Sequence, residues 1–156
     1  MKFQISKSSL FKSISHLQGI VDKKNTLPVL SNILIEAKNN ALTLSSTDMD
    51  ISIIDMVSCS VLEEGATTIN SQIFYDIIRK LDDSSNIEII SNNGKILTLR
   101  SNGSRFSLAC LPKEDFPIID KVNDGTNIKI NSKILFKLID KTKFAISNEE
   151  TRYFLN

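Results

Sequence analysis

The stretch ATTINSQIFYDIIRKL, Ala66–Leu81, predicts a short strand followed by a helix. Its first four residues favour a strand because three of them are β-branched. Asn70 or Ser71 can cap the helix, since a short polar side chain accepts a hydrogen bond from a free N–H of the first turn. Apolar residues then recur at helical spacing and form one stripe, which consists of Ile73, Phe74, Ile77, Ile78 and Leu81.

The same order of strand, polar cap and amphipathic helix occurs three times along the chain. The first copy has a strand at 2–5, a polar cap at Ser8-Ser9 and a helical stripe that begins at Leu10. The third has a strand at 127–130, a cap at Asn131-Ser132 and a stripe that begins at Ile134. Matching Leu10, Ile73 and Ile134 gives spacings of 63 and 61 residues. A recurring module of this length predicts a repeat architecture.

Strand-like runs follow each of the first two helices. They lie at 29–37, 41–46 and 51–61 in the first unit, and at 87–90, 96–100 and 105–111 in the second. An Asn-Gly pair at 93–94 marks a hairpin turn. The sequence therefore predicts an α+β protein, made of pseudo-symmetric β-α-β-β-β repeats whose helices cover one face of antiparallel sheets.

The repeats also predict the domain boundaries. We expect a first domain at 1–120, with two repeats at about 1–62 and 66–111 followed by a linker. Residues 127–156 are expected to be the truncated start of a second domain. A lone strand and helix cannot bury their own apolar face, so we expect the natural assembly to need more polypeptide.

The composition argues against a disordered chain and against a general polycation. Hydrophobic residues make up 41% of the 156 residues and charged residues 24%, with a net charge of +1. Cys59 and Cys110 lie far apart in strand-like runs and are expected to be reduced thiols. No apolar run approaches the length of a membrane span, so we expect a soluble, intracellular protein without a membrane partner.

The polar faces of the three helices are rich in basic residues. Those on or next to the helices are Lys7, Lys12, Lys23, Lys24, Arg79, Lys80, Lys133, Lys137 and Lys141. On one helix such residues are usually ordinary solvated charge. Three repeated helices with a shared cationic side indicate instead a surface that attracts phosphates without reading bases, with weak and salt-sensitive binding.

Few residues in the sequence suggest a catalytic site. His16 is the only histidine, and nothing near it in sequence suggests a triad. Asp48 and Asp50 would share one side of a strand and could serve a small metal-dependent phosphoesterase, although a solvated strand end explains them better. A second alternative is a scaffold domain that binds a protein through an open strand edge. We predict no catalytic residue, metal ligand or cofactor.

Several short motifs occur together and in order along the whole chain. They are Met1-Lys2-Phe3, Thr26-Leu27-Pro28-Val29-Leu30-Ser31-Asn32, Thr47-Asp48, Gly65-Ala66-Thr67-Thr68, Ser104-Arg105-Phe106-Ser107-Leu108, Leu111-Pro112, Asp115-Phe116-Pro117 and Thr151-Arg152-Tyr153-Phe154-Leu155-Asn156. With them the chain resembles the bacterial DNA polymerase III beta subunit family, the sliding clamps. The match is to the family's first domain and the opening of its second.

The resemblance implies a function that is not enzymatic. Clamps are head-to-tail homodimers of three-domain chains that close as a ring around double-stranded DNA, with helices lining the hole and sheets outside. They tether the replicative polymerase as its processivity factor and are placed on DNA by a clamp loader. This chain alone is expected not to close a ring, because the third domain is absent.

The resemblance also implies site residues. The DNA-binding positions are Lys24, Gln72, Arg79, Lys137, Glu149, Arg152, Tyr153 and Phe154. Gln72 stands where a basic residue can occur, and Glu149 stands where a neutral amide can, so both departures weaken contact with phosphates. The dimer-interface positions are Arg105, Phe106 and Leu108, on an edge strand. Phe106 and Leu108 could equally be inward core residues of that strand.

Overall fold

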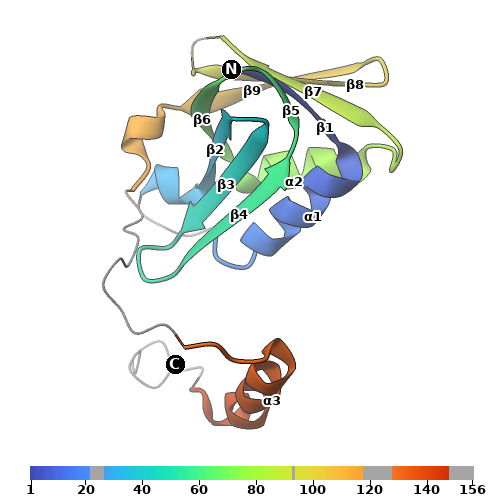
Figure 1. Cartoon of the computed structure of the whole chain (residues 1–156). Coiled ribbons are helices and arrows are strands. Elements are labelled where there is room, and N and C mark those ends of the chain that lie inside the picture. Colours follow the sequence, from blue (N-terminus) through green and yellow to red (C-terminus); the bar gives the residue numbers. More distant parts are fainter. Residues whose placement is uncertain (22–26, 93, 118–127, 148–156) are drawn as a thin grey trace. The chain divides into compact units, whose positions relative to one another are not determined.

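The computed structural model describes residues 1–21, 27–92, 94–117 and 128–147 (Figure 1). The chain separates into two compact units, Met1–Ile119 and Asp120–Asn156. The elements of the first unit are β1 (Lys2–Ser6), α1 (Lys7–Leu17), η1 (Pro28–Ser31), β2 (Asn32–Lys38), β3 (Ala41–Thr47), β4 (Ser52–Ser58), β5 (Ser60–Glu63), β6 (Gly65–Asn70), α2 (Ser71–Lys80), β7 (Asn86–Ser91), β8 (Ile96–Ser101), β9 (Ser104–Leu111) and η2 (Lys113–Asp115). The second unit contains α3 (Ser132–Thr142) and η3 (Lys143–Ala145).

A polar side chain caps the start of each α-helix. Ser6 Oγ accepts from the backbone N–H of Ser9 at 3.3 Å, and Asn70 Oδ1 accepts from that of Ile73 at 3.0 Å. Asn131 caps α3 in the same way. These bonds satisfy amide groups that have no partner inside the helix. The predicted order of strand, cap and helix is therefore confirmed for the first two copies. The predicted cap at Ser8-Ser9 is wrong, because Ser6 caps α1 and residues 8 and 9 lie in its first turn.

The caps also correct the register of the repeat. Ser6 and Asn70 lie 64 positions apart, so Leu10 corresponds to Phe74 and not to Ile73. Leu10 and Phe74 are completely buried, whereas Ile73 is 51% exposed. The predicted match was wrong by one residue because the cap, and not the first apolar residue, sets which side of the helix faces the core. The second spacing, from Asn70 to Asn131, is 61 as predicted.

All strands of the first unit pair antiparallel in one nine-stranded sheet, in the order β4-β3-β2-β6-β9-β8-β7-β1-β5. Cys59 alone separates β4, which pairs with β3, from β5, which pairs with β1. Strand β9 also changes its neighbour along its length. Residues 104–109 pair with β8, and Cys110 and Leu111 pair with β6. The two predicted repeats are therefore confirmed, except that the single strand predicted at 51–61 is two strands, β4 and β5, with different neighbours.

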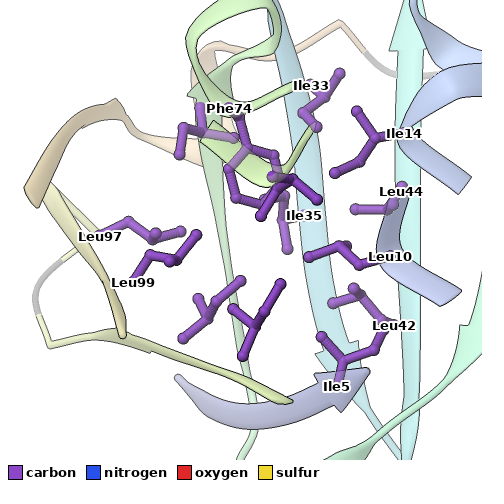
Figure 2. Packing of buried hydrophobic residues seen from close by; sticks show 14 of the residues in the cluster. Ile5, Leu10, Ile14, Ile33, Ile35, Leu42, Leu44, Phe74, Leu97 and Leu99 are labelled. Atoms are coloured by element: carbon purple, nitrogen blue, oxygen red, sulfur yellow. The ribbon is translucent and has the colours of Figure 1, made fainter. Parts of the chain in front are cut away.

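The core lies between the sheet and the helix pair α1 and α2, which contact each other on one side of the sheet (Figure 1). Figure 2 shows apolar side chains from β1, β2, β3 and β8 pointing toward those of the two helices. Ile14 of α1, Ile35 of β2, Phe74 of α2 and Leu99 of β8 are completely buried. Each such side chain contributes about 2 kcal/mol through loss of contact with water. Both helices are thus held with their polar faces away from the core.

The second unit is less complete. Helix α3 begins where the sequence predicts it, but every residue from 128 to 146 is exposed. The predicted strand at 127–130 is not found in 128–130, and residue 127 lies outside the described part. A strand requires a neighbour for its backbone groups, and none is available to 128–130 among the described residues. The predicted linker at 120–126 also lies outside the described residues.

Candidate nucleic-acid interface

The polar faces of α1 and α2 form a surface on the side of the helix pair that the core does not use. Lys12 of α1 and Arg79 and Lys80 of α2 are exposed there. Asp76 is the only acidic residue within these two helices. The two helices therefore carry more basic than acidic residues, although the whole chain is almost neutral.

Lys7 does not belong to that surface, and its predicted place there is wrong. Its side chain is buried and makes an ion pair with Asp83, while its ammonium lies 4.9 Å from the centre of the Phe11 ring. The backbone N–H of Lys7 also donates to the carbonyl of Ser85 at 2.9 Å, which fixes the start of α1 against the segment that follows α2. The hydrogen bond from Lys7 and its positive charge lower the pKa of Asp83.

An aromatic pair connects the two helices. The rings of Phe11 on α1 and Tyr75 on α2 stack with their centres 5.5 Å apart and their planes at 27°. The guanidinium carbon of Arg79 lies 5.7 Å from the centre of the Tyr75 ring. Stacking of this kind favours one packing of the helices, and the ring also favours one position of the Arg79 side chain.

The outward face of α2 contains a small polar network around one carboxylate. Gln72 Nε2 donates to Asp76 Oδ2 at 2.9 Å, and Arg79 Nη2 lies 3.2 Å from Asp76 Oδ1. Both predicted DNA-binding residues of this helix are therefore held by the same acid. The sequence places these three side chains on one helix face, because their spacings are four and three residues, but it assigns Asp76 no part in the site.

The remaining predicted DNA-binding residues lie elsewhere. Lys137 is exposed on α3, next to Lys133 and Lys141 in the same helical stripe. The only ion pair of α3 with another described residue joins Asp140 to Lys143 at 2.6 Å. The predicted residues Lys24, Glu149, Arg152, Tyr153 and Phe154 lie outside the described residues.

Strand β9 provides an open edge. Residues 104–109 pair with β8 on one side, and no other described strand pairs with their second side. Phe106 and Leu108 face inward and are half-buried against the core, whereas Arg105 is exposed. Arg105 stands opposite Arg100 across the two strands and has no ion pair with another described residue. The structure thus favours Phe106 and Leu108 as residues that pack their side chains against the core. Their role in a dimer interface stays a prediction.

The acidic pair considered for catalysis forms a turn. Asp48 and Asp50 lie between β3 and β4, and Asp48 Oδ1 accepts from the backbone N–H groups of Asp50 at 3.0 Å and Ile51 at 2.7 Å. His16 Nδ1 lies 3.0 Å from Asp55 Oδ2 of β4. Across the described residues, no group of three or more His, Cys, Asp or Glu side chains could hold a metal ion. These contacts give Asp48 and His16 structural roles.

The cysteines are free thiols in the first unit. Cys110 is buried and Cys59 is half-buried, and burial raises the pKa of both thiols. A raised pKa leaves less thiolate near neutral pH, which is typical of structural cysteines. None of the described helices has the length and apolar character needed to cross a membrane.

Comparisons with known proteins agree with this geometry. Residues 1–120 match the family model of the DNA polymerase III beta subunit, N-terminal domain. The beta sliding clamps of Caulobacter vibrioides and Chlamydia muridarum are 40% and 37% identical over 100% and 99% of this chain. The chain spans 42% of the length of each.

Solved structures show the same similarity. The beta sliding clamp of Caulobacter crescentus has a TM-score of 0.94 at 39% identity, and the DNA polymerase III subunit beta of Pseudomonas aeruginosa has 0.92 at 32%. Each comparison covers 100% of this chain and 42% of the other. The paired helices, the antiparallel sheet and the matches over the full chain place this protein in the DNA polymerase III beta subunit family, the bacterial sliding clamps.

Proposed function

We propose that this chain is a portion of a processivity clamp for the replicative DNA polymerase. The assembled clamp encircles double-stranded DNA without sequence specificity and tethers the polymerase, and it catalyses no reaction. Its first domain is 1–120, and 127–156 begin its second. It acts in the cytoplasm, where the clamp loader and the polymerase are its partners.

The cationic surface of α1 and α2 is the observation that carries this proposal. Lys12, Arg79 and Lys80 lie on the side of the helices that the core leaves free, and charged groups on regular helices contact phosphates without reading base edges. Sequence-independent contact is what a sliding protein requires. We infer that the DNA-binding residues are Lys24, Gln72, Arg79, Lys137, Glu149, Arg152, Tyr153 and Phe154.

The open edge of β9 supports an assembly role for the same chain. A strand with unpaired backbone groups on one side pairs readily with another strand. We propose that Arg105, Phe106 and Leu108 form the dimer interface, where a strand of a neighbouring clamp chain continues the sheet. Arg100 beside it pairs with Glu88, so the exposed Arg105 is the cation that an acidic residue across that interface would meet.

DNA binding tests the first part of the proposal. Fluorescence anisotropy with two labelled duplexes of unrelated sequence should give weak and equal affinities that fall steeply between about 50 and 200 mM salt. Lys24→Ala should lower both affinities equally, whereas Lys38→Ala at the end of β2 is the matched control and should have little effect. A strong preference for one duplex would contradict the proposal.

Reconstitution tests the second part. The chain, mixed with a separately supplied remainder of a clamp, should form a dimeric ring that size-exclusion chromatography with light scattering detects. Arg105→Glu should reduce ring formation, and Lys113→Glu in η2 serves as the control for a change of charge. If no ring forms, the scaffold interpretation of the open edge of β9 is favoured instead.

A further inference from the structure

We propose that Asp76 limits the DNA affinity of α2 by holding its two candidate contacts, Gln72 and Arg79. The inference rests on the proposed function, because it assigns a role within the DNA-facing surface. Asp76 here is a positioning residue, which acts on DNA through Arg79 and is not itself a contact. DNA phosphates would have to displace its carboxylate before Arg79 could pair with them.

The geometry of the network supports this role. One carboxylate oxygen of Asp76 accepts from Gln72 at 2.9 Å, and the other lies 3.2 Å from Arg79. The ring of Tyr75 lies beside the same guanidinium. Arg79 is therefore held along the helix, between an acid and an aromatic ring, and its charge is largely balanced before any phosphate arrives.

The exposure of these side chains shows that the network has little importance for folding. The side chains of Arg79 and Asp76 are 55% and 41% exposed. Ion pairs this accessible to water contribute little to stability. Loss of the pair should therefore leave the fold intact, so that a change in DNA binding can be measured on a folded protein.

The electrostatics also favour an effect on DNA. By pairing with Arg79, the carboxylate of Asp76 withdraws one cation from the surface. Affinity and its salt dependence both follow the number of cations that pair with phosphates. A sliding protein benefits from contacts that form and release easily. Each time Arg79 leaves a phosphate, the carboxylate of Asp76 can pair with it again.

The test uses the full chain of 156 residues and four variants: Asp76→Asn, Arg79→Ala, the double variant, and Glu114→Gln. Asparagine keeps the size of Asp76 and can still accept from Gln72, but it has no charge. Glu114 lies in η2, is exposed and has no ion pair with another described residue, so it controls for the loss of one negative charge. Binding to a labelled duplex is measured by anisotropy across a range of salt concentrations, and circular dichroism checks the helix content.

We expect Asp76→Asn to bind about three- to fivefold more tightly at about 50 mM salt, with a salt slope steeper by up to about one counterion. In the Arg79→Ala background the same change should gain less than about twofold, because the carboxylate then has no cation to hold. Glu114→Gln should match the wild type.

Three outcomes would overturn the inference. One is an unchanged affinity for Asp76→Asn while the wild type binds DNA, which leaves the proposed function standing. Another is an equal gain for Glu114→Gln, or for Asp76→Asn without Arg79, since either would indicate net charge alone. The last is that neither wild type nor Asp76→Asn binds DNA at the lowest salt, which would refute the proposed function as well.

Discussion

Helices α2 and α3 have the same sequence pattern but different surroundings. Each begins after an asparagine cap and carries an apolar stripe on one face and basic residues on the other. In α2 the stripe residues Phe74 and Ile78 are completely buried against the sheet. In α3 the corresponding Leu135 is 43% exposed and Ile139 is 55% exposed.

The difference separates local from tertiary contributions to a helix. The cap and the spacing of apolar residues act within the helix, so they place the start of both helices correctly. Burial requires other elements, and α2 has the strands of both repeats beneath it. An isolated helix of the length of α3 is marginal in water, because nucleation is costly and most helix stability comes from packing.

Hydrogen exchange should show the largest contrast. We expect the central amides of α2 to exchange only through global unfolding, which slows them by roughly a thousandfold or more. The amides of α3 should be protected by less than about tenfold. Mass spectrometry or NMR of the whole chain measures both helices in one sample. Equal protection of α2 and α3 would mean that α3 has a packing partner in solution.

The next contrast is in unfolding free energy. Phe74→Ala removes a completely buried ring and should destabilise the first unit by roughly 3–5 kcal/mol. Phe136→Ala on α3 is the matched control, because that ring is 72% exposed, and it should change stability by less than about 0.5 kcal/mol. Urea unfolding followed by circular dichroism measures both. A cost for Phe136→Ala close to that of Phe74→Ala would contradict the comparison.

Removing the helix cap should also lower the unfolding free energy more for α2 than for α3, but by less than removing the buried ring does. Asn70→Ala leaves the N–H of Ile73 without its acceptor and should cost about 1 kcal/mol in the same urea experiment. Asn131→Ala removes the equivalent cap of α3 and should leave the unfolding transition of the first unit unchanged. A shift of that transition in Asn131→Ala would show that the two units unfold together.

The smallest effect concerns pH and the Lys7–Asp83 pair, which has no equivalent in α3. Because the folded state lowers the pKa of Asp83, the pair stabilises the protein above the usual carboxyl range, and this contribution is lost as pH falls through the lowered value. The melting temperature of Asp83→Asn should therefore lie below that of the wild type at pH 7 and approach it as the pH falls through the lowered pKa of Asp83. Asp50→Asn, an exposed turn residue, should show no such dependence; a similar pH dependence in that variant would indicate a general charge effect.

Much of the fold could be predicted from the sequence because the same order of elements occurs in both repeats. The order of elements in Met1–Ile119 follows from apolar spacing, caps and turns, all of which are local. The one-residue error at Ile73 arose because apolar spacing alone leaves the face of a helix undetermined to within about one position, and only the cap fixes it. The absence of a strand at 128–130 could not be predicted, because a strand depends on a neighbour that local sequence does not describe.

The candidate site was less predictable for the same reason. The exposed positions of Arg79 and Lys137 follow from helical periodicity. The burial of Lys7 does not, because it depends on Asp83, which is distant in sequence and becomes a partner only when β7 pairs with β1. The role that we propose for Asp76 required the contacts in the structure, since the spacing alone does not say which of several polar neighbours pair with the carboxylate.

The position of β1 in the sheet also limits when the chain can fold during translation. Strand β1 lies between β5 and β7, so it leaves the ribosome before both of its neighbours, residues 60–63 and 86–91. At a synthesis rate of roughly 5–20 residues per second, β1 spends several seconds with both edges unpaired. Neither repeat can mature alone during translation, and the nascent chain must be kept from associating with other polypeptides until most of the first unit has emerged.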